Sequence, residues 1–189
     1  MKNISTSLLL LALFTTLIAG KCRKEKTPLE QLPPETQTGA NTFGCLVNGN
    51  VHIPKGSPLS GPNLAFVYQY LLNGTPAGYT FALGATNKKD PTNITTVGFG
   101  FDSVRMNTGL YLLKARRNEQ GGGQVGFYNN NNPNGDLYST NELITGELNI
   151  KKLDTINQIA SGTFWFNAAN TSGQKVEVRE GRFDVRYTR

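Results

Sequence analysis

The stretch TTVGFGF, residues 95–101, decides the fold because it places an apolar side chain at every second position. Val97, Phe99 and Phe101 alternate there with two glycines. Successive side chains of a β-strand point to opposite faces, so this period of two predicts a strand that buries one face. A helix would instead need apolar residues three and four positions apart.

Short runs of the same kind recur on both sides of this stretch, separated by Gly, Asn and Pro, and no long window shows helical spacing. Asn48-Gly49 joins the first two runs and is a strong hairpin signal. About ten such runs predict an all-β, antiparallel domain at residues 41–189, either a β-sandwich or a barrel-like sheet. The remaining runs cover residues 43–47, 51–53, 64–72, 79–83, 109–114, 124–128, 137–139, 145–151, 156–168, 175–179 and 182–187.

The composition agrees with a turn-rich β protein. The 189 residues include 21 Gly and 9 Pro, and only 17% are charged. The formal net charge is +6, but the basic residues fall in short clusters without the aromatic interleaving of a nucleic-acid-binding module. We therefore expect no nucleic acid among its partners.

The N-terminal segment has the features of a signal peptide. Lys2 supplies a positive start, and the run from Leu8 to Ala19 is apolar apart from Thr15 and Thr16. Such a run is too short to span a membrane comfortably, so residues 1–21 are predicted to be removed on export.

Cys22 follows the sequence LIAGK, residues 17–21, which resembles the lipobox of bacterial lipoproteins. This pattern predicts that Cys22 carries a lipid anchor, although Lys21 stands where Gly or Ala is expected. The alternative is cleavage near Gly20, after which Cys22 could form a disulfide with Cys45 in an oxidising compartment. With Cys22 lipidated, Cys45 is predicted to be a buried, inert thiol.

Residues 22–40 read as a linker. Four residues after the cysteine, 23–26, are charged and mostly basic, and three prolines follow with Thr, Gln and Glu. This composition predicts a stretched tether between lipid and domain, whose basic start would help binding to an anionic leaflet.

The sequence shows no catalytic constellation. The one histidine, His52, lies between Val51 and Ile53 and is expected to be a strand residue. One His and two separated Cys cannot form a zinc site, and the tract at 129–132 reads as a loop, so we predict neither metal nor cofactor. Candidate carboxylates for a hydrolase are scattered along the chain: Asp102, Asp136, Glu142, Glu147 and Asp184.

A ligand-binding role rests on Trp165, Arg182 and Asp184. Trp165 should point away from the face that Phe164 and Phe166 share, which leaves it as core of a two-sided strand or as a surface platform for sugar rings. Arg182 and Asp184 should share one strand face, after a turn that Gly181 permits with a positive φ. Further aromatic candidates for stacking are Tyr68, Tyr70, Tyr79, Tyr111, Tyr128 and Tyr138.

Two blocks resemble an uncharacterised family of predicted Bacteroidota lipoproteins, classed as a domain of unknown function. One is TGANTFGCLVNG at 38–49; the other is SGTFWFNA at 161–168 with EGRFD at 180–184. The resemblance covers both ends of the mature domain, less clearly its middle. It implies export, lipidation and a β fold, and no activity. In that phylum, surface-displayed lipoproteins often carry acidic residues after the cysteine; Arg23 and Lys24 therefore favour the periplasmic face of the outer membrane.

Three functions follow in order of preference. The first is a non-catalytic envelope lipoprotein whose β domain binds a ligand or partner. The second is a hydrolase that uses carboxylates, which requires two carboxyl groups within about 5–10 Å in a cleft. The third is a structural component of the envelope.

Overall fold

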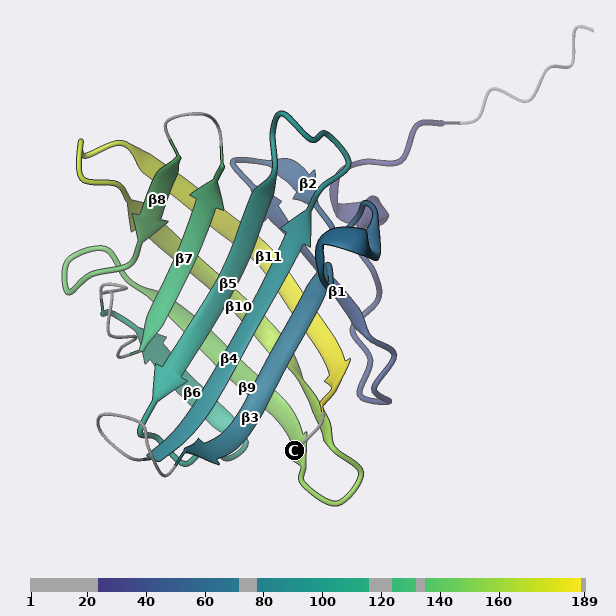
Figure 1. Cartoon of the computed structure of the whole chain (residues 1–189), viewed down its shortest axis with the longest axis vertical. Coiled ribbons are helices and arrows are strands. Elements are labelled where there is room, and N and C mark those ends of the chain that lie inside the picture. Colours follow the sequence, from purple (N-terminus) through teal and green to yellow (C-terminus); the bar gives the residue numbers. More distant parts are fainter. Residues whose placement is uncertain (1–23, 72–77, 116–123, 132–134, 188–189) are drawn as a thin grey trace, which may run out of the picture.

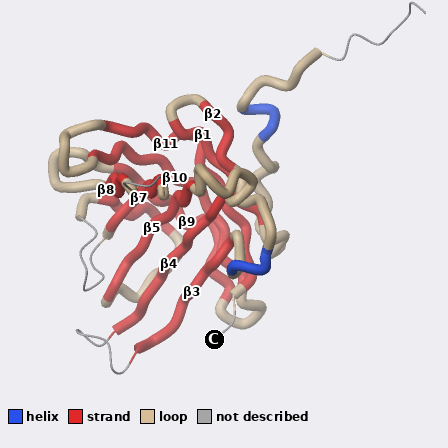
Figure 2. The backbone as a smooth tube through the Cα atoms, turned by 45° about the horizontal axis from the view of Figure 1, so that its top comes forward, coloured by secondary structure: helices blue, strands red, loops and turns tan. Residues whose placement is uncertain are grey.

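The structure is a computed structural model that describes residues 24–71, 78–115, 124–131 and 135–187 (Figure 1). The predicted signal peptide and Cys22 lie outside these residues, as do two stretches whose composition predicts turns, Asn73-Gly74 and the glycines at 121–123. The described strands are β1 (Thr42–Val47), β2 (Asn50–His52), β3 (Leu64–Leu71), β4 (Gly78–Asn87), β5 (Thr95–Asp102), β6 (Gly109–Leu113), β7 (Val125–Asn130), β8 (Asp136–Ser139), β9 (Gly146–Asp154), β10 (Ile159–Ala169) and β11 (Lys175–Arg186). Two 3₁₀ turns, η1 (Leu29–Gln31) and η2 (Pro58–Ser60), lie outside the sheet (Figure 2).

The strands form one antiparallel sheet that branches at β10. Its main order is β2-β1-β11-β10-β8-β7-β5-β4-β3. The first part of β10 pairs with β9, which pairs with β6, whereas Ala169 at its end pairs with Ser139 of β8. The sheet therefore divides at β10 and curls into a half-barrel whose two walls face each other (Figures 1 and 2). The predicted all-β, antiparallel fold is confirmed.

Aromatic rings from both walls fill the space between them. Phe99 of β5 has its ring centroid 5.2 Å from that of Phe164 in β10 and 5.4 Å from that of Phe183 in β11. Val97, Phe99 and Phe101 are each 0% exposed, as the alternation in residues 95–101 predicts. Such ring pairs add to the stabilisation that burial of their apolar area provides.

The predicted hairpin between β1 and β2 is present. Asn48 and Gly49 both have positive φ, 49° and 79°, and Val47 pairs with Asn50 across the turn. Two central residues with positive φ are the geometry of a type I′ turn, which matches the twist of the two strands.

His52 lies in β2, as predicted, and connects that edge of the sheet to the opposite wall. It is 4% exposed, and its Nε2 lies 3.0 Å from the carbonyl oxygen of Ala85 in β4. Next to it, Lys55 forms a parallel bridge with Asn87. These contacts hold the edge formed by β2 against the end of β4.

β11 differs from the prediction because residues 175–179 and 182–187 were expected as separate runs. They form one strand that contains an irregularity: its pairing shifts between Phe164 and Phe166 in β10. The positive φ predicted near Gly181 was placed one residue too late, since Glu180 has the φ of 55°. Gly181 is required for a different reason, because a Cβ there would lie 2.5 Å from the carbonyl oxygen of Phe164.

The expected loop at 129–132 is partly wrong. Asn129 and Asn130 belong to β7 and pair with Leu137 and Asp136 of β8. The tertiary pairing therefore overrides the turn preference of asparagine at these two positions.

Candidate functional site

Trp165 lies on the outer face of β10, as the alternation predicts. Its flanking residues Phe164 and Phe166 are 3% and 0% exposed, whereas Trp165 is 37% exposed. Its indole Nε1–H donates to Glu147 Oε2 at 3.1 Å, and the guanidinium of Arg179 lies 5.5 Å from the ring centroid. The indole is therefore fixed at its edge by a carboxylate and attracted to a cation over one face.

Trp165 and Arg182 line the same surface hollow, which we call the tryptophan hollow. Its volume is about 460 Å³, and it lies over β9, β10 and β11. Glu35, from the predicted linker, also lines it. The structure thus brings two of the three candidate residues together at one hollow.

The charges of the tryptophan hollow are balanced by ion pairs. Arg182 Nη2 lies 3.2 Å from Glu180 Oε2, and the Lys151 ammonium pairs with the Glu35 carboxylate. These pairs are partly exposed, so each contributes little to stability. The tryptophan hollow therefore offers one exposed aromatic ring beside basic side chains that are already paired with carboxylates.

Asp184, the third candidate, lies elsewhere and has a different set of partners. It is 1% exposed, and its carboxylate accepts hydrogen bonds from the backbone N–H groups of Thr38 (2.9 Å), Gly39 (2.7 Å) and Ala40 (3.1 Å). The hydroxyl of Thr36 donates to it at 2.6 Å. Burial alone would raise the pKa of Asp184, but the hydrogen bonds together hold it below its usual value.

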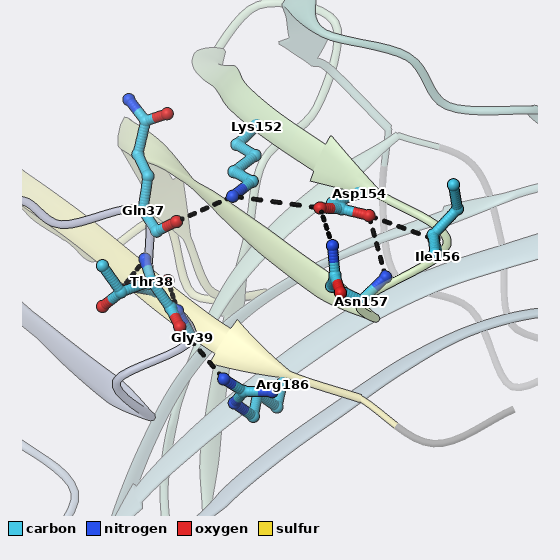
Figure 3. A network of polar contacts seen from close by, with 9 residues as sticks. Gln37, Thr38, Gly39, Lys152, Asp154, Ile156, Asn157 and Arg186 are labelled. Atoms are coloured by element: carbon cyan, nitrogen blue, oxygen red, sulfur yellow. Dashed lines mark hydrogen bonds and ion pairs between the residues drawn. The ribbon is translucent and has the colours of Figure 1, made fainter.

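Asp184 therefore fixes the end of the predicted linker to the sheet. We call residues 35–40 the strap. Lys152 donates to the carbonyl oxygen of Gln37 at 3.1 Å, and Arg186 to that of Thr38 at 3.4 Å, as Figure 3 shows. The sequence analysis assigns residues 35–40 to the linker, and their composition gives no signal of this attachment. In the structure the strap is bonded to the β domain.

A second hollow, larger than the tryptophan hollow, lies at one end of the half-barrel. We call it the tyrosine hollow, and its volume is about 720 Å³. It forms where β3 and β9 end, β4 begins, and the chain leaves β11. Its lining residues are Tyr68, Gln69, Tyr70, Tyr79, Arg105, Met106, Asn107, Thr108, Leu153, Thr155 and Tyr187.

The tyrosine rings of this hollow contact one another. Tyr68 and Tyr79 are stacked with ring centroids 5.6 Å apart, and Tyr70 meets Tyr79 edge-on at 5.2 Å. Tyr187 packs edge-on against Tyr68 at 5.9 Å. Tyr68 and Tyr187 are 7% and 4% exposed, while Tyr70 is 53% exposed. The deep rings form a packed floor, and Tyr70 stands at the rim.

The floor of the tyrosine hollow is held by a hydrogen bond to the loop between β5 and β6. The Tyr68 hydroxyl donates to the carbonyl oxygen of Met106 at 3.3 Å, and Met106 is 1% exposed. Burial, with a smaller contribution from Tyr79, raises the pKa of Tyr68. This hydroxyl therefore stays neutral at physiological pH and acts as a structural donor.

Sequence reasoning named Tyr68, Tyr70 and Tyr79 as stacking candidates without bringing them together. Tyr187 was placed in the last strand and was not considered as a binding residue. Tyr68, Tyr70 and Tyr79 lie at the same end of β3 and β4, and Tyr187 directly follows β11, but only the strand register brings these ends together. The sequence carries no signal for that register.

The remaining chemistry-bearing residues that the sequence singles out, Cys45 and His52, are both buried. Cys45 is 0% exposed and is the free cysteine of the described residues; burial raises the pKa of its thiol well above the usual range. Burial likewise lowers the pKa of His52. In the part of the chain that the structure places, no three His, Cys, Asp or Glu side chains gather as a metal site, and no helix has the length and apolar character to cross a membrane.

The fold and its hollows define the class: an all-β, antiparallel half-barrel with an aromatic recess at one end. The sequence profile of a family described as a domain of unknown function (DUF6252) matches residues 80–185, more than half of the chain, and the chain belongs to this family. The match includes the middle of the domain, which the resemblance covered less clearly, and excludes the block at 38–49. Comparison with curated proteins and with solved structures gave no match.

Proposed function

We propose that this protein is a non-catalytic lipoprotein of the bacterial cell envelope, and that its β domain binds a small ring-containing ligand in the tyrosine hollow. The hollow carries the proposal. Its volume of about 720 Å³ falls within the range of ligand pockets, about 300–1,000 Å³, and aromatic side chains dominate its floor. Mouths of barrel-like sheets are frequent ligand sites.

The chemistry of the hollow favours a ligand with a flat face and polar edges. Tyr70, which is 53% exposed at the rim, offers a ring for stacking, and both Tyr70 and Tyr79 carry hydroxyls for hydrogen bonds. Gln69, Asn107 and Thr108 add amide and hydroxyl groups around the rim. Sugar rings and aromatic rings both combine these two properties.

The envelope location rests on the N-terminal sequence. Residues 1–21 have the pattern of a signal peptide, and Cys22 follows a lipobox-like segment. The proposed site is the outer membrane of a Bacteroidota species, on its periplasmic face, because Arg23 and Lys24 follow the cysteine.

The direction of the chain supports a hollow that faces away from the anchoring surface. Figure 1 shows the described N-terminal segment leaving the domain at one end of the half-barrel, and β3 and the last described residues ending at the other. The tyrosine hollow lies at this second end. A lipid on Cys22 would then leave its mouth open to the surrounding compartment.

The anchor is tested by the intact mass of the protein extracted from membranes, beside a Cys22→Ser variant. The proposal expects a mature N-terminus at Cys22 with added acyl mass, and loss of that mass in the variant. An unacylated protein cleaved elsewhere would contradict the anchor and would revive the Cys22–Cys45 disulfide.

The binding site is tested by calorimetric titration of the mature chain with chitobiose, digalacturonate and 4-hydroxybenzoate. We expect at least one of these probes to bind, and Tyr79→Ala to weaken it at least tenfold. Tyr128→Ala is the matched control, because Tyr128 pairs with Tyr138 outside the hollow. Absence of binding by all three probes, or an equal effect of both variants, would contradict the proposed site.

A further inference from the structure

The charge in the tyrosine hollow is one-sided. Arg105 is the one formally charged side chain among its described lining residues, and no Asp or Glu lines it. A cation in a recess lined by aromatic rings attracts an anion more strongly than it would on an open surface, because the low-dielectric walls focus its field. From this we propose that the ligand of the tyrosine hollow is an anionic ring compound, whose carboxylate binds Arg105 while its ring stacks on tyrosine. The inference rests on the proposed function.

Arg105 is available for such a contact. Its side chain is exposed, and its guanidinium carbon lies 5.9 Å from the ring centroid of Tyr79. Within the described residues, it forms no ion pair with a carboxylate. A guanidinium beside a tyrosine ring can bind a carboxylate through two parallel N–H groups while the ring contacts the rest of the ligand.

The loop that carries Arg105 is held on both sides. Met106 is buried and accepts the hydrogen bond of Tyr68, and Val104 packs against the core. The backbone N–H of Asn107 donates to the Tyr111 hydroxyl at 2.8 Å, and this hydroxyl donates back to the Asn107 carbonyl oxygen at 3.2 Å. The backbone around Arg105 is therefore already ordered, so binding has to fix only the rotamers of the Arg105 side chain, and its entropic cost is lower than on a free loop.

The carboxylates closest in sequence to the hollow have other partners. Asp102 accepts from the hydroxyl of Thr80 at 3.4 Å and does not line the hollow. Asp154 accepts from the backbone N–H groups of Ile156 and Asn157 at the β9–β10 turn, as Figure 3 shows. Neither side chain neutralises Arg105.

The tryptophan hollow provides the contrast within the same molecule. There, Arg182 pairs with Glu180, and Lys151 pairs with Glu35. An anion entering that hollow would have to displace a carboxylate already present. We therefore expect the tyrosine hollow, and not the tryptophan hollow, to prefer an anionic ligand.

Two chemical sources share the required features: an acidic sugar and an aromatic carboxylate. The test titrates the mature chain with digalacturonate and its dimethyl ester, and with 4-hydroxybenzoate and 4-hydroxybenzamide, by calorimetry at low salt. We expect the acid of at least one pair to bind about tenfold or more tightly than its neutral partner, and the pair that binds identifies the source.

Arg105→Gln should remove the preference for the acid, and Arg105→Lys should keep part of it. Arg182→Gln is the matched control and should leave the preference unchanged. The inference is overturned if the neutral and acidic partners bind equally well, or if Arg105→Gln keeps the preference for the acid. In either case the proposed function still stands if a probe binds to the parent and Tyr79→Ala abolishes that binding. If no acid or neutral probe binds, both proposals fail.

Discussion

Replacement of Asp184 by asparagine tests the role of the strap most sharply. The two carboxylate oxygens accept five hydrogen bonds in all, from the Thr36 and Thr38 hydroxyls and from the N–H groups of Thr38, Gly39 and Ala40. Asparagine keeps the shape of the side chain but retains one acceptor oxygen. With that oxygen at the Oδ2 position, the amide NH₂ would face the N–H of Gly39, a donor from which it cannot accept, and the negative charge would be lost.

The magnitude follows from these bonds. A hydrogen bond to a charged group contributes about 1.5–3 kcal/mol, and the five are not additive, because the strap can detach and bind water. We therefore expect Asp184→Asn to lower the free energy of unfolding by about 2–4 kcal/mol at pH 7. Urea unfolding of the mature chain bearing Cys22→Ser measures this loss. Asp136→Asn, at an exposed carboxylate of β8, is the control and should stay near the parent value.

The pH dependence gives a second check on Asp184. Its pKa is held below the usual value in the folded protein, so the unfolded chain takes up the proton first as the pH falls. The stabilisation is complete above the unfolded value of about 3.9 and is lost as the pH falls through the folded value. The difference between parent and variant should narrow below pH about 4. A loss of less than about 0.5 kcal/mol at pH 7, with hydrogen exchange at Gly39 and Ala40 unchanged, would refute the role of Asp184 in fixing the strap to the sheet.

Three further predictions concern buried or crowded residues. Burial lowers the pKa of His52 in the folded state, so the stability that its neutral form supports is present above the pKa of the unfolded chain, about 6.5, and is lost as the pH falls below that value. The urea midpoint of the parent should therefore drop more between pH 7 and pH 5 than that of His52→Gln. Equal drops in the two proteins would contradict this. Gly181→Ala should destabilise by about 1–3 kcal/mol in the same assay, because its Cβ would lie 2.5 Å from the carbonyl oxygen of Phe164, whereas Gly84→Ala, with open space around its Cβ, should be nearly neutral; equal effects would refute the crowding argument. Cys45, buried and with a raised pKa, should react with a thiol reagent only in denaturant when Cys22 is replaced by Ser, and rapid labelling of the native protein would contradict its placement.

The local alternation of the sequence was sufficient to predict most of the strands. Phe99 and Phe101 are buried, and Trp165 points outward, because each follows the period of two that a strand imposes. The Asn48-Gly49 hairpin was also predictable, because a type I′ turn needs positive φ at both central residues and Asn-Gly favours that geometry. These features depend only on neighbours in the chain.

Features that depend on register were not predictable. Tyr68 and Tyr79 meet through the pairing of the adjacent strands β3 and β4, whereas Tyr187 reaches Tyr68 only because the sheet branches at β10 and curls. The sequence suggested Asp184 as a ligand-binding residue and not as an anchor of the strap, because its partners are mostly backbone N–H groups of the strap, which leave no trace in composition. Gly181 was assigned to a turn, whereas close packing of β10 and β11 explains it.

Ligand binding in the tyrosine hollow should be visible in backbone ¹H–¹⁵N spectra of the mature chain with Cys22→Ser, titrated with digalacturonate and with 4-hydroxybenzoate. We expect saturable shifts concentrated at Tyr70, Tyr79 and residues 105–108, with the amides around Trp165 unchanged. Shifts centred on Trp165 and Arg182, or no saturable shift with either acid, would contradict it.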